Sequence, residues 1–408
     1  MPTTTEFKYT VRDRAGKTHN GTLDGPDQQV VVAKLREMGY VPVSVTATNA
    51  GAGLNTAITI PGFGPKVGLK DLSIFSRQFA TMISSGLTLI RALNILAEQS
   101  ENPKLAEIIG EVRNDIETGR SLSEAVADHE EFPKLYVAMV RAGETAGMLD
   151  EVLLRVAETL EKDLALRRKI KSALTYPVVV LLMAVVLVGI MLVFIVPTFV
   201  EMFDSLGGTL PLPTTVLMGA SEILTSYWYI IMFVPPAAWK AFVYARKQPR
   251  VRHGLDRLKL KLPVFGTLFH KLALTRFARN FGILLAAGVP ILTALEITAE
   301  TVNNGVIGDA ANDVKMSVKE GESVAGPLGR HAVFPPMVVQ MISVGEDTGA
   351  MDTMLGKIAD FYDQEVEAMT ESLTAMLEPL MIGVLGGVVG GMVIALYMPM
   401  FKIFELIE

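Results

Sequence analysis

The 408-residue sequence contains no cysteine, and only five histidines and two tryptophans. Without cysteine, disulfides, thiolate nucleophiles and cysteine-ligated metals are excluded. The histidines have no partner at metal-ligand spacing, and no phosphate-binding Gly-x-x-x-x-Gly-Lys-Ser/Thr motif occurs. The sequence therefore predicts no metal site, no cofactor and no catalytic residue, so we do not expect an enzyme. A membrane-tethered hydrolase is the enzymatic alternative, because active sites can assemble from residues far apart in sequence.

The sequence also has no excess of basic residues. It contains 37 Lys and Arg and 43 Asp and Glu, which gives a net charge of −6. Nucleic acid is therefore not expected as a partner, because binding it requires a basic surface. Apolar residues make up 50% of the chain, and the mean hydropathy of +0.38 is high for a soluble protein. The segment MPTTTEFKYTVRDRAGK has no apolar core. We predict no cleaved signal peptide and a cytoplasmic N-terminus.

Three segments are predicted to be transmembrane helices. The first, 172–200, and the third, 379–401, contain no charged residue. At 1.5 Å per residue, both can cross a hydrocarbon core of about 30 Å. The second, 222–245, is less regular because it contains Pro235 and Pro236, but aromatic residues stand at both of its ends.

The orientation of the spans follows from their basic flanks. Lys and Arg residues precede the first span and follow the second, so both flanks are predicted to be cytoplasmic. Residues 201–221 are then a short external loop, and the C-terminus after the third span is external. The basic run 246–261 is explained mainly by this topology, and binding of anionic lipid headgroups is the alternative.

The chain repeats itself with an offset of 202 residues. FSRQFATMISSGLTLIRALNI at 75–95 aligns with FARNFGILLAAGVPILTALEI at 277–297. Further along, RAGETAGMLDEVL at 141–153 aligns with SVGEDTGAMDTML at 343–355, so Gly-Glu-x-x-Gly-x-x-Asp occurs twice. Prolines in the spans match at the same offset. Each repeat unit is therefore a soluble module followed by a span, and the second span returns the chain to the cytoplasm.

The predicted fold class is mainly α: an integral membrane protein with two repeated cytoplasmic helical bundles, three transmembrane helices and a small N-terminal α+β unit. Apolar residues recur at helical spacing in both modules, 69–171 and 246–378. In residues 1–48, a hairpin with a turn at 14–17, a helix from about Asp27 to Met38 and a strand at 41–45 predict the α+β unit. Residues 49–68, rich in Gly, Ala and Pro, predict a flexible linker.

The repeated motif has two interpretations. In the structural one, Gly147 and Gly349 provide a positive φ at a helix end, and the following aspartates begin the next helix. In the functional one, Glu144 and Glu346 contact a motor protein or a neighbouring copy of the chain. Helix-end chemistry explains the glycines but does not require a glutamate, so the role of both glutamates stays open.

Arg77 and Arg279 lie at equivalent positions of otherwise apolar helical segments. A buried guanidinium needs a carboxylate or a carbonyl. We therefore expect each arginine to pair with an acid of its own module, the motif glutamate being the first candidate. The alternative is that each arginine faces a partner protein.

Glycines and charges also mark the helices that lead into the membrane. Gly383, Gly387 and Gly391 recur every four residues, which predicts close packing of the third span against another span or a second copy. Before the first span the chain is basic, and before the third it is acidic, so the two helices are predicted to pair within a chain or between copies. The residues are Arg167, Arg168, Lys169 and Lys171 on one side and Asp360, Asp363, Glu367 and Glu371 on the other.

The doubled module with Gly-Glu-x-x-Gly, the Tyr176-Pro177 and Glu378-Pro379 pairs at the spans, and the small N-terminal unit resemble the type II secretion system F family. The resemblance extends from about residue 6 to the C-terminus. It implies a non-enzymatic platform in the inner (cytoplasmic) membrane of a type IV pilus or type II secretion machine. Such a platform couples a cytoplasmic assembly ATPase to the extraction and polymerisation of pilins or pseudopilins.

The resemblance also implies the partners: the ATPase, pilins or pseudopilins, other inner-membrane components, the lipid bilayer and further copies of the chain. A membrane permease or transporter subunit is the alternative from another functional class. Against it, the first and third spans contain no ionisable residue that could line a substrate path.

Overall fold

The computed structural model describes residues 5–12, 18–25, 28–48, 66–205, 211–246, 248–263 and 265–407. Contacts divide the chain into two units, Met1–Pro65 and Lys66–Glu408. The predicted turn at 14–17 and residues 49–65 of the predicted linker lie outside the described residues.

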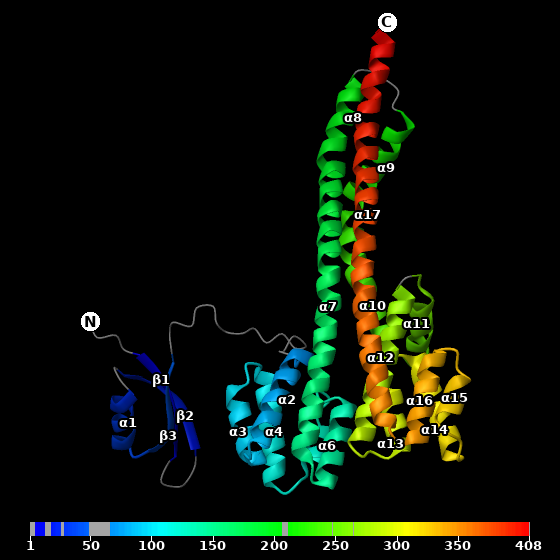
Figure 1. Ribbon diagram of the computed structural model, residues 1–408. Helices are drawn as coiled ribbons and strands as arrows, with labels where there is room; N and C mark the ends of the chain where they lie inside the picture. Colours follow the sequence, from blue (N-terminus) through cyan, green and yellow to red (C-terminus); the bar gives the residue numbers. More distant parts are fainter. Residues whose placement is uncertain are drawn as a thin grey trace. The chain divides into compact units, whose positions relative to one another are not determined.

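The first unit contains β1 (Thr5–Arg12), β2 (Thr18–Gly25), α1 (Gln28–Glu37) and β3 (Val41–Thr48) (Figure 1). The strands form an antiparallel sheet in the order β2-β1-β3. Val31 and Leu35 of α1 pack against Val11 of β1. Pro42, which cannot donate a backbone hydrogen bond, lies on an edge strand beside the point where the register shifts.

The second unit contains both helical modules. The first module comprises α2 (Leu69–Ser84), α3 (Leu89–Gln99), α4 (Pro103–Glu117), α5 (Leu122–Ala127), α6 (Lys134–Ala146) and the start of α7 (Leu149–Ile190). The second comprises α11 (Pro249–Lys261), α12 (Phe265–Ala286), α13 (Ile291–Thr301), α14 (Gly305–Lys319), α15 (Ala325–Gly329), α16 (Pro336–Thr348) and the start of α17 (Met351–Ile407). The bounds of α3, α4 and α6 recur in α13, α14 and α16 at the 202-residue offset of the sequence repeat.

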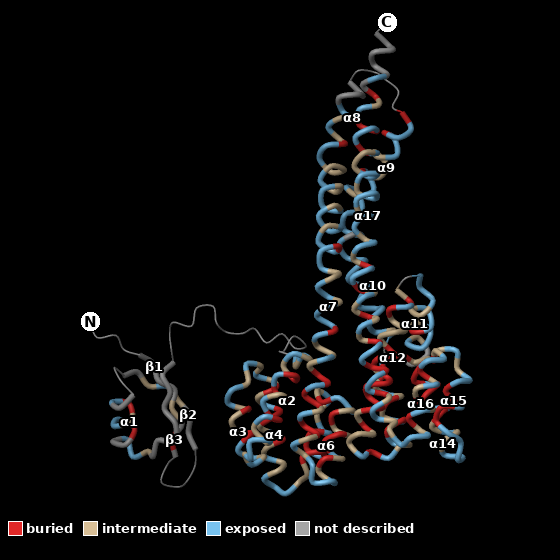
Figure 2. The backbone as a smooth tube through the Cα atoms, in the orientation of Figure 1, coloured by how far each residue is buried: buried red, intermediate tan, exposed pale blue. Residues whose placement is uncertain are grey.

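The buried apolar residues of the two modules form one continuous core. Aromatic contacts are repeated in it, since Phe75 packs on Phe132 and Phe277 packs on Phe334. Figure 2 shows that buried positions gather in the modules, whereas the far parts of α7 and α17 are largely exposed. Because one core joins the modules, both must lie on the same side of any membrane that the chain crosses.

Two helical stretches are long and apolar enough to cross a membrane, Leu149–Glu201 and Met351–Pro399. The first runs from α7 through a π-helical turn, η1 (Met191–Ile195), into α8 (Val196–Ser205). Beyond the modules its large apolar side chains are exposed, with Leu182 at 66% and Met183 at 65%. Apolar surface of this extent suits contact with lipid.

The predicted second span, 222–245, is not one straight helix. α9 (Leu212–Ser226) and α10 (Trp228–Ala245) meet at an angle of 66° and form a third crossing only if the bent pair is counted as one broken span. Within the predicted external loop 201–221, the parts that belong to α8 and α9 are helical, while 206–210 lie outside the described residues. Hydropathy missed α9 because threonine, serine and glutamate interrupt its apolar residues.

Two hydroxyl groups of α9 bind backbone carbonyls near prolines of the apolar helices. Pro197 and Pro399 occupy equivalent repeat positions, and each lacks the N–H that would bond a carbonyl one turn earlier. Ser221 donates to a carbonyl of the π-helical turn (2.5 Å), and Thr214 donates to the carbonyl of Ala395 (2.6 Å). Both hydroxyl residues are buried, so α9 links the far ends of the two long helices.

The glycine stripe on α17 does not pack closely against another helix of this chain. A methyl group at Gly383, Gly387 or Gly391 would meet no atom of the described residues within 4 Å. The described residues therefore show no close contact between this stripe and another span of the same chain, and α17 meets α9 one turn further along, around Ala395. Packing against a second copy stays a prediction.

Candidate functional site

The repeated motif forms the joint between α6 and α7 and the joint between α16 and α17. Gly147 and Gly349 have φ values of 69° and 68°, the left-handed conformation that the motif predicts. Asp150 and Asp352 stand in the first turn of the next helix, where the helix dipole favours an acid. The second glycine and the aspartate therefore set the geometry of each turn.

The first glycine of each motif allows close helix packing, a role that the sequence pattern did not reveal. Gly143 and Gly345 are buried. A Cβ atom at Gly143 would lie 2.9 Å from the Cβ of Val152, and one at Gly345 would lie 2.9 Å from the Cα of Met351. Any larger residue at these positions would push the two helices apart.

The motif glutamates bind the first backbone N–H groups of a short helix that precedes them by about 20 residues. The carboxylate of Glu144 accepts hydrogen bonds from the N–H groups of Leu122 (2.5 Å) and Ser123 (3.0 Å) at the start of α5. The carboxylate of Glu346 accepts from Val324 (2.9 and 3.0 Å) and Ala325 (3.2 Å) at the start of α15.

This capping explains why a glutamate stands at both positions. The first N–H groups of a helix have no partner within the helix, and a carboxylate there also interacts favourably with the helix dipole. Helices α5 and α15 have six and five residues, so they are too short to be stable alone. Because each carboxylate is bound inside its module, we infer that Glu144 and Glu346 serve the fold rather than an outer contact surface.

Both arginines pair with an acid of their own module, but that acid is not the motif glutamate. Arg77 donates from Nε and Nη2 to the two carboxylate oxygens of Glu161, at 2.6 and 2.5 Å. Arg279 donates to Asp363, which occupies the position equivalent to Glu161 in the repeat. The motif glutamate was the wrong candidate because its carboxylate is used at the short helix.

The two arginine pairs differ in their exposure. Side-chain exposure is 34% and 42% for Arg77 and Glu161, but 7% and 27% for Arg279 and Asp363. Hydrogen bonding to Arg77 lowers the pKa of Glu161. Burial raises the pKa of Asp363 in spite of the nearby Arg279, and one oxygen of Asp363 is buried without a hydrogen-bond partner. The second module therefore holds its pair at a higher desolvation cost.

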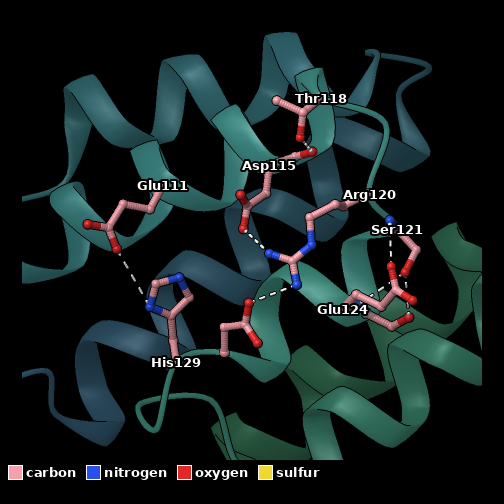
Figure 3. Close-up of polar contacts among 9 residues, drawn as sticks. Glu111, Asp115, Thr118, Arg120, Ser121, Glu124 and His129 are labelled. Atoms are coloured by element: carbon pink, nitrogen blue, oxygen red, sulfur yellow. Dashed lines mark hydrogen bonds and ion pairs between the residues drawn. The ribbon is translucent and has the colours of Figure 1, made fainter.

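A second ion pair recurs with its charges exchanged. In the first module, Arg120 lies 2.7 Å from Asp115 (Figure 3) and 2.7 Å from Asp128. The positions equivalent to Arg120 and Asp128 are Glu322 and Arg330, which pair at 2.8 Å. Because the acid and the base have exchanged positions between the two modules, the pair requires opposite charges but not a particular side chain at either position. We interpret it as a structural clamp on the loop before α5 and α15.

Histidine–acid contacts also recur without forming a metal site. His129 lies 3.8 Å from Glu111 (Figure 3), and the equivalent His331 lies 3.6 Å from Asp313. Among the residues that the structure describes, no group of three or more His, Cys, Asp or Glu is placed to hold a metal ion.

The predicted pairing of basic and acidic helices occurs within one chain. Along the facing sides of α7 and α17, Lys162 contacts Asp360 at 3.1 Å, and Lys169 contacts Glu367. Each pair is about half exposed, so its contribution to stability is small. Together they set which faces of the two helices meet where the helices leave the modules.

Comparison with known proteins matches the duplicated architecture. The family described as "Type II secretion system (T2SS), protein F" matches residues 75–197 and 277–399, and the related N-terminal domain family matches residues 1–46. The two matches of the first family are offset by the 202 residues of the internal repeat.

The chain belongs to the type II secretion system protein F family. Its relatives include the type IV pilus assembly proteins PilC of Myxococcus xanthus, 42% identical over 98% of this chain and 95% of the relative, and of Thermus thermophilus, 44% identical over 97% and 98%. The type II secretion system protein F of Vibrio cholerae is 33% identical over 89% of both chains.

In this member of the type II secretion system protein F family, sequence spacing indicated the joint glycines and the arginine positions. It did not indicate the buried Gly143 and Gly345 as packing residues, nor Glu161 as a partner of Arg77. The constant 202-residue offset was the available signal for Glu161, because an acid recurs at that place in the second module, as Asp363.

Proposed function

We propose that this chain is a non-enzymatic inner-membrane platform that couples a cytoplasmic assembly ATPase to the extraction and polymerisation of pilins or pseudopilins. The observation that carries the proposal is the continuity of α7 and α17, each of which begins in a soluble module and extends without a break into an apolar stretch. A force on either module therefore acts directly on a helix that is suited to the membrane.

The relatives support a pilus machine in the first place. Two pilus assembly proteins are 42% and 44% identical to this chain, whereas the V. cholerae secretion protein is 33% identical. A type II secretion machine is the second possibility within the same class of function.

The basic flanks of the spans support a topology with both modules and the N-terminus in the cytoplasm and the C-terminus outside, and the packing supports placing both modules on one side. The modules share one core, and α7 and α17 leave them side by side in the same direction (Figure 1). After α7 the chain must return across the membrane before the second module begins. The bent pair α9–α10 is the connection that supplies this return.

The proposal is tested by measuring whether the protein binds the assembly ATPase. We expect the full-length protein in lipid nanodiscs to retain the assembly ATPase from the same organism, and the purified chain to hydrolyse no ATP by itself. Co-purification is measured with empty nanodiscs as the control. Failure to retain the ATPase, together with solute transport by vesicles that contain only this chain, would instead support a permease.

We also propose that the glycine stripe of α17 packs against a second copy, since no helix of the described chain covers it. Replacing Gly387 with leucine is expected to shift the detergent-solubilised protein to a smaller assembly while membrane insertion persists. Light scattering coupled to size exclusion measures the mass, and Gly189→Leu on α7, which also has open space around it, is the matched control. An unchanged mass for Gly387→Leu would contradict the proposal.

A further inference from the structure

A cavity of about 770 Å³ lies where α7, α11 and α12 meet near the end of α10. Its wall contains six cationic side chains and one acid, Asp256. The cations are Arg167, Lys171, Arg246, Arg252, Lys259 and Arg276. This concentration of positive charge indicates an anionic ligand.

The one acid of the wall cannot neutralise the cavity. Asp256 is 3% exposed, and its two oxygens accept hydrogen bonds from Lys259 (2.7 Å) and from the backbone N–H of Gly305 (3.1 Å). Among the described residues, Lys171 and Arg252 form no ion pair. Lys259, Arg167 and Arg276 each have a carboxylate neighbour, so among the described residues the uncompensated charge of the cavity is that of Lys171, Arg246 and Arg252.

Arg276 is the most enclosed cation of the wall. Its side chain is 20% exposed, and its carboxylate neighbour, Asp163, is 3.4 Å away and also pairs with Arg167 at 3.0 Å. Burial lowers the pKa of Arg276. The equivalent residue of the first module is Ile74, beside a cavity of only about 200 Å³, so the basic cavity is not part of the repeated architecture.

An apolar groove of about 640 Å³ lies between α7 and α17, and its first residue on α7, Leu174, follows Lys171 of the basic cavity by three positions. Arg167 and Lys171 line the cavity, and Leu174, Val178 and Leu181 line the groove. These residues are three or four apart, so they share one face of the helix. The groove is walled almost wholly by apolar side chains, in contrast to the cavity beside it.

The boundary between cavity and groove coincides with the sequence boundary between charged and apolar residues. Lys171 directly precedes the uncharged stretch 172–200, and Arg246 directly follows α10. A ligand in this position meets cations at its polar end and aliphatic side chains beyond. Free phosphate would fill the cavity but leave the groove empty, whereas an anionic phospholipid fills both.

We propose that this site binds an anionic phospholipid, with its phosphate among the cations of the cavity and an acyl chain in the groove between α7 and α17. Basic pockets between membrane helices on the cytoplasmic side are suited to such headgroups. The lipid would fill the gap between the two long helices at the level where they leave the modules.

The proposal is tested with the full-length protein purified in a neutral detergent. Native mass spectrometry measures binding of dioleoyl phosphatidylglycerol, dioleoyl phosphatidylcholine and inorganic phosphate. We expect phosphatidylglycerol to bind and the other two not to bind at the same concentrations. Replacing one cation is expected to weaken binding about fivefold, so the double variant Lys171→Gln, Arg252→Gln should bind about 25-fold more weakly.

Matched controls are available on the same helices. Arg168→Gln on α7 and Arg257→Gln on α11 remove exposed cations that do not line the cavity, and both should bind phosphatidylglycerol as the unaltered protein does. Val178→Trp should fill the groove and weaken lipid binding while all cations remain. Equal binding of phosphatidylcholine or of free phosphate, or equal losses in the control variants, would overturn the proposal.

Discussion

Replacing Asp363 with alanine is expected to destabilise the second module by about 3 kcal/mol, because it leaves the Arg279 guanidinium without its carboxylate. Arg279 retains 7% exposure of its side chain, so water cannot replace the lost partner. The free energy of local opening is measured by hydrogen exchange of the α12 amides in the full-length protein in detergent.

The repeat supplies the control for this prediction. Glu161→Ala removes the equivalent carboxylate beside Arg77, but that pair is more than one-third exposed on both sides, so we expect a loss below about 1 kcal/mol. The double variant Arg279→Met, Asp363→Leu should recover most of the stability, because apolar residues replace a costly buried pair. Equal losses in the two single alanine variants would contradict the prediction.

The pH dependence of the same two acids should have opposite signs. Burial raises the pKa of the Asp363 carboxyl group above its value in the unfolded chain. The contribution of Asp363 to folding stability is therefore fully present at pH values below its unfolded pKa, and it is lost as the pH rises through its folded pKa. The bond from Arg77 lowers the pKa of Glu161. Its contribution is present above the unfolded pKa and is lost as pH falls through the folded value. Hydrogen exchange measured as a function of pH should show both trends, the α12 amides reporting on the Asp363 pair and the α2 amides on the Glu161 pair.

Replacing Glu346 with alanine is expected to destabilise α15 and its surroundings by roughly 2–3 kcal/mol. The change removes the acceptor of the Val324 and Ala325 N–H groups, and unsatisfied buried donors cost about 1–3 kcal/mol each. Val324 is 1% exposed, so water has little access. We expect the amides of α15 to exchange faster while those of α13 change little.

Glu144→Ala should have the same effect on α5, since its carboxylate binds Leu122 and Ser123. Glu124→Ala serves as the control, because the side chain of Glu124 is exposed at the same helix start and its removal should cost less than about 1 kcal/mol. If Glu144→Ala weakened binding of the ATPase while α5 kept its full protection, the glutamate would be a contact residue rather than a cap.

Much of the helical framework could be predicted because the repeat doubles the evidence for it. Several helix ends are marked twice by glycine, asparagine or serine at the same offset, and Gly147 and Gly349 adopt the conformation that this spacing indicates. Local chemistry determines such features, so a single chain is enough to detect them.

Other features depend on contacts between distant segments and could not be derived from spacing. Glu144 reaches a helix 22 residues earlier, and Arg77 reaches an acid 84 residues later. The bend between α9 and α10 was missed because a hydropathy average does not distinguish a straight helix from two short ones. The stripe from Gly383 to Gly391 shows that small residues permit close packing without specifying which helix supplies it.

The prolines near the two ends of each long helix differ in the support that they receive from neighbouring helices. At Pro197 and Pro399, hydroxyl groups of α9 brace the helices from outside. At Pro177 and Pro379, which stand near the modules, the described contacts include no comparable hydroxyl from another helix at the carbonyls of Ala173 and Ala375. Bending therefore costs least at this end. We therefore expect the two long helices to bend more readily at Pro177 and Pro379 than at Pro197 and Pro399.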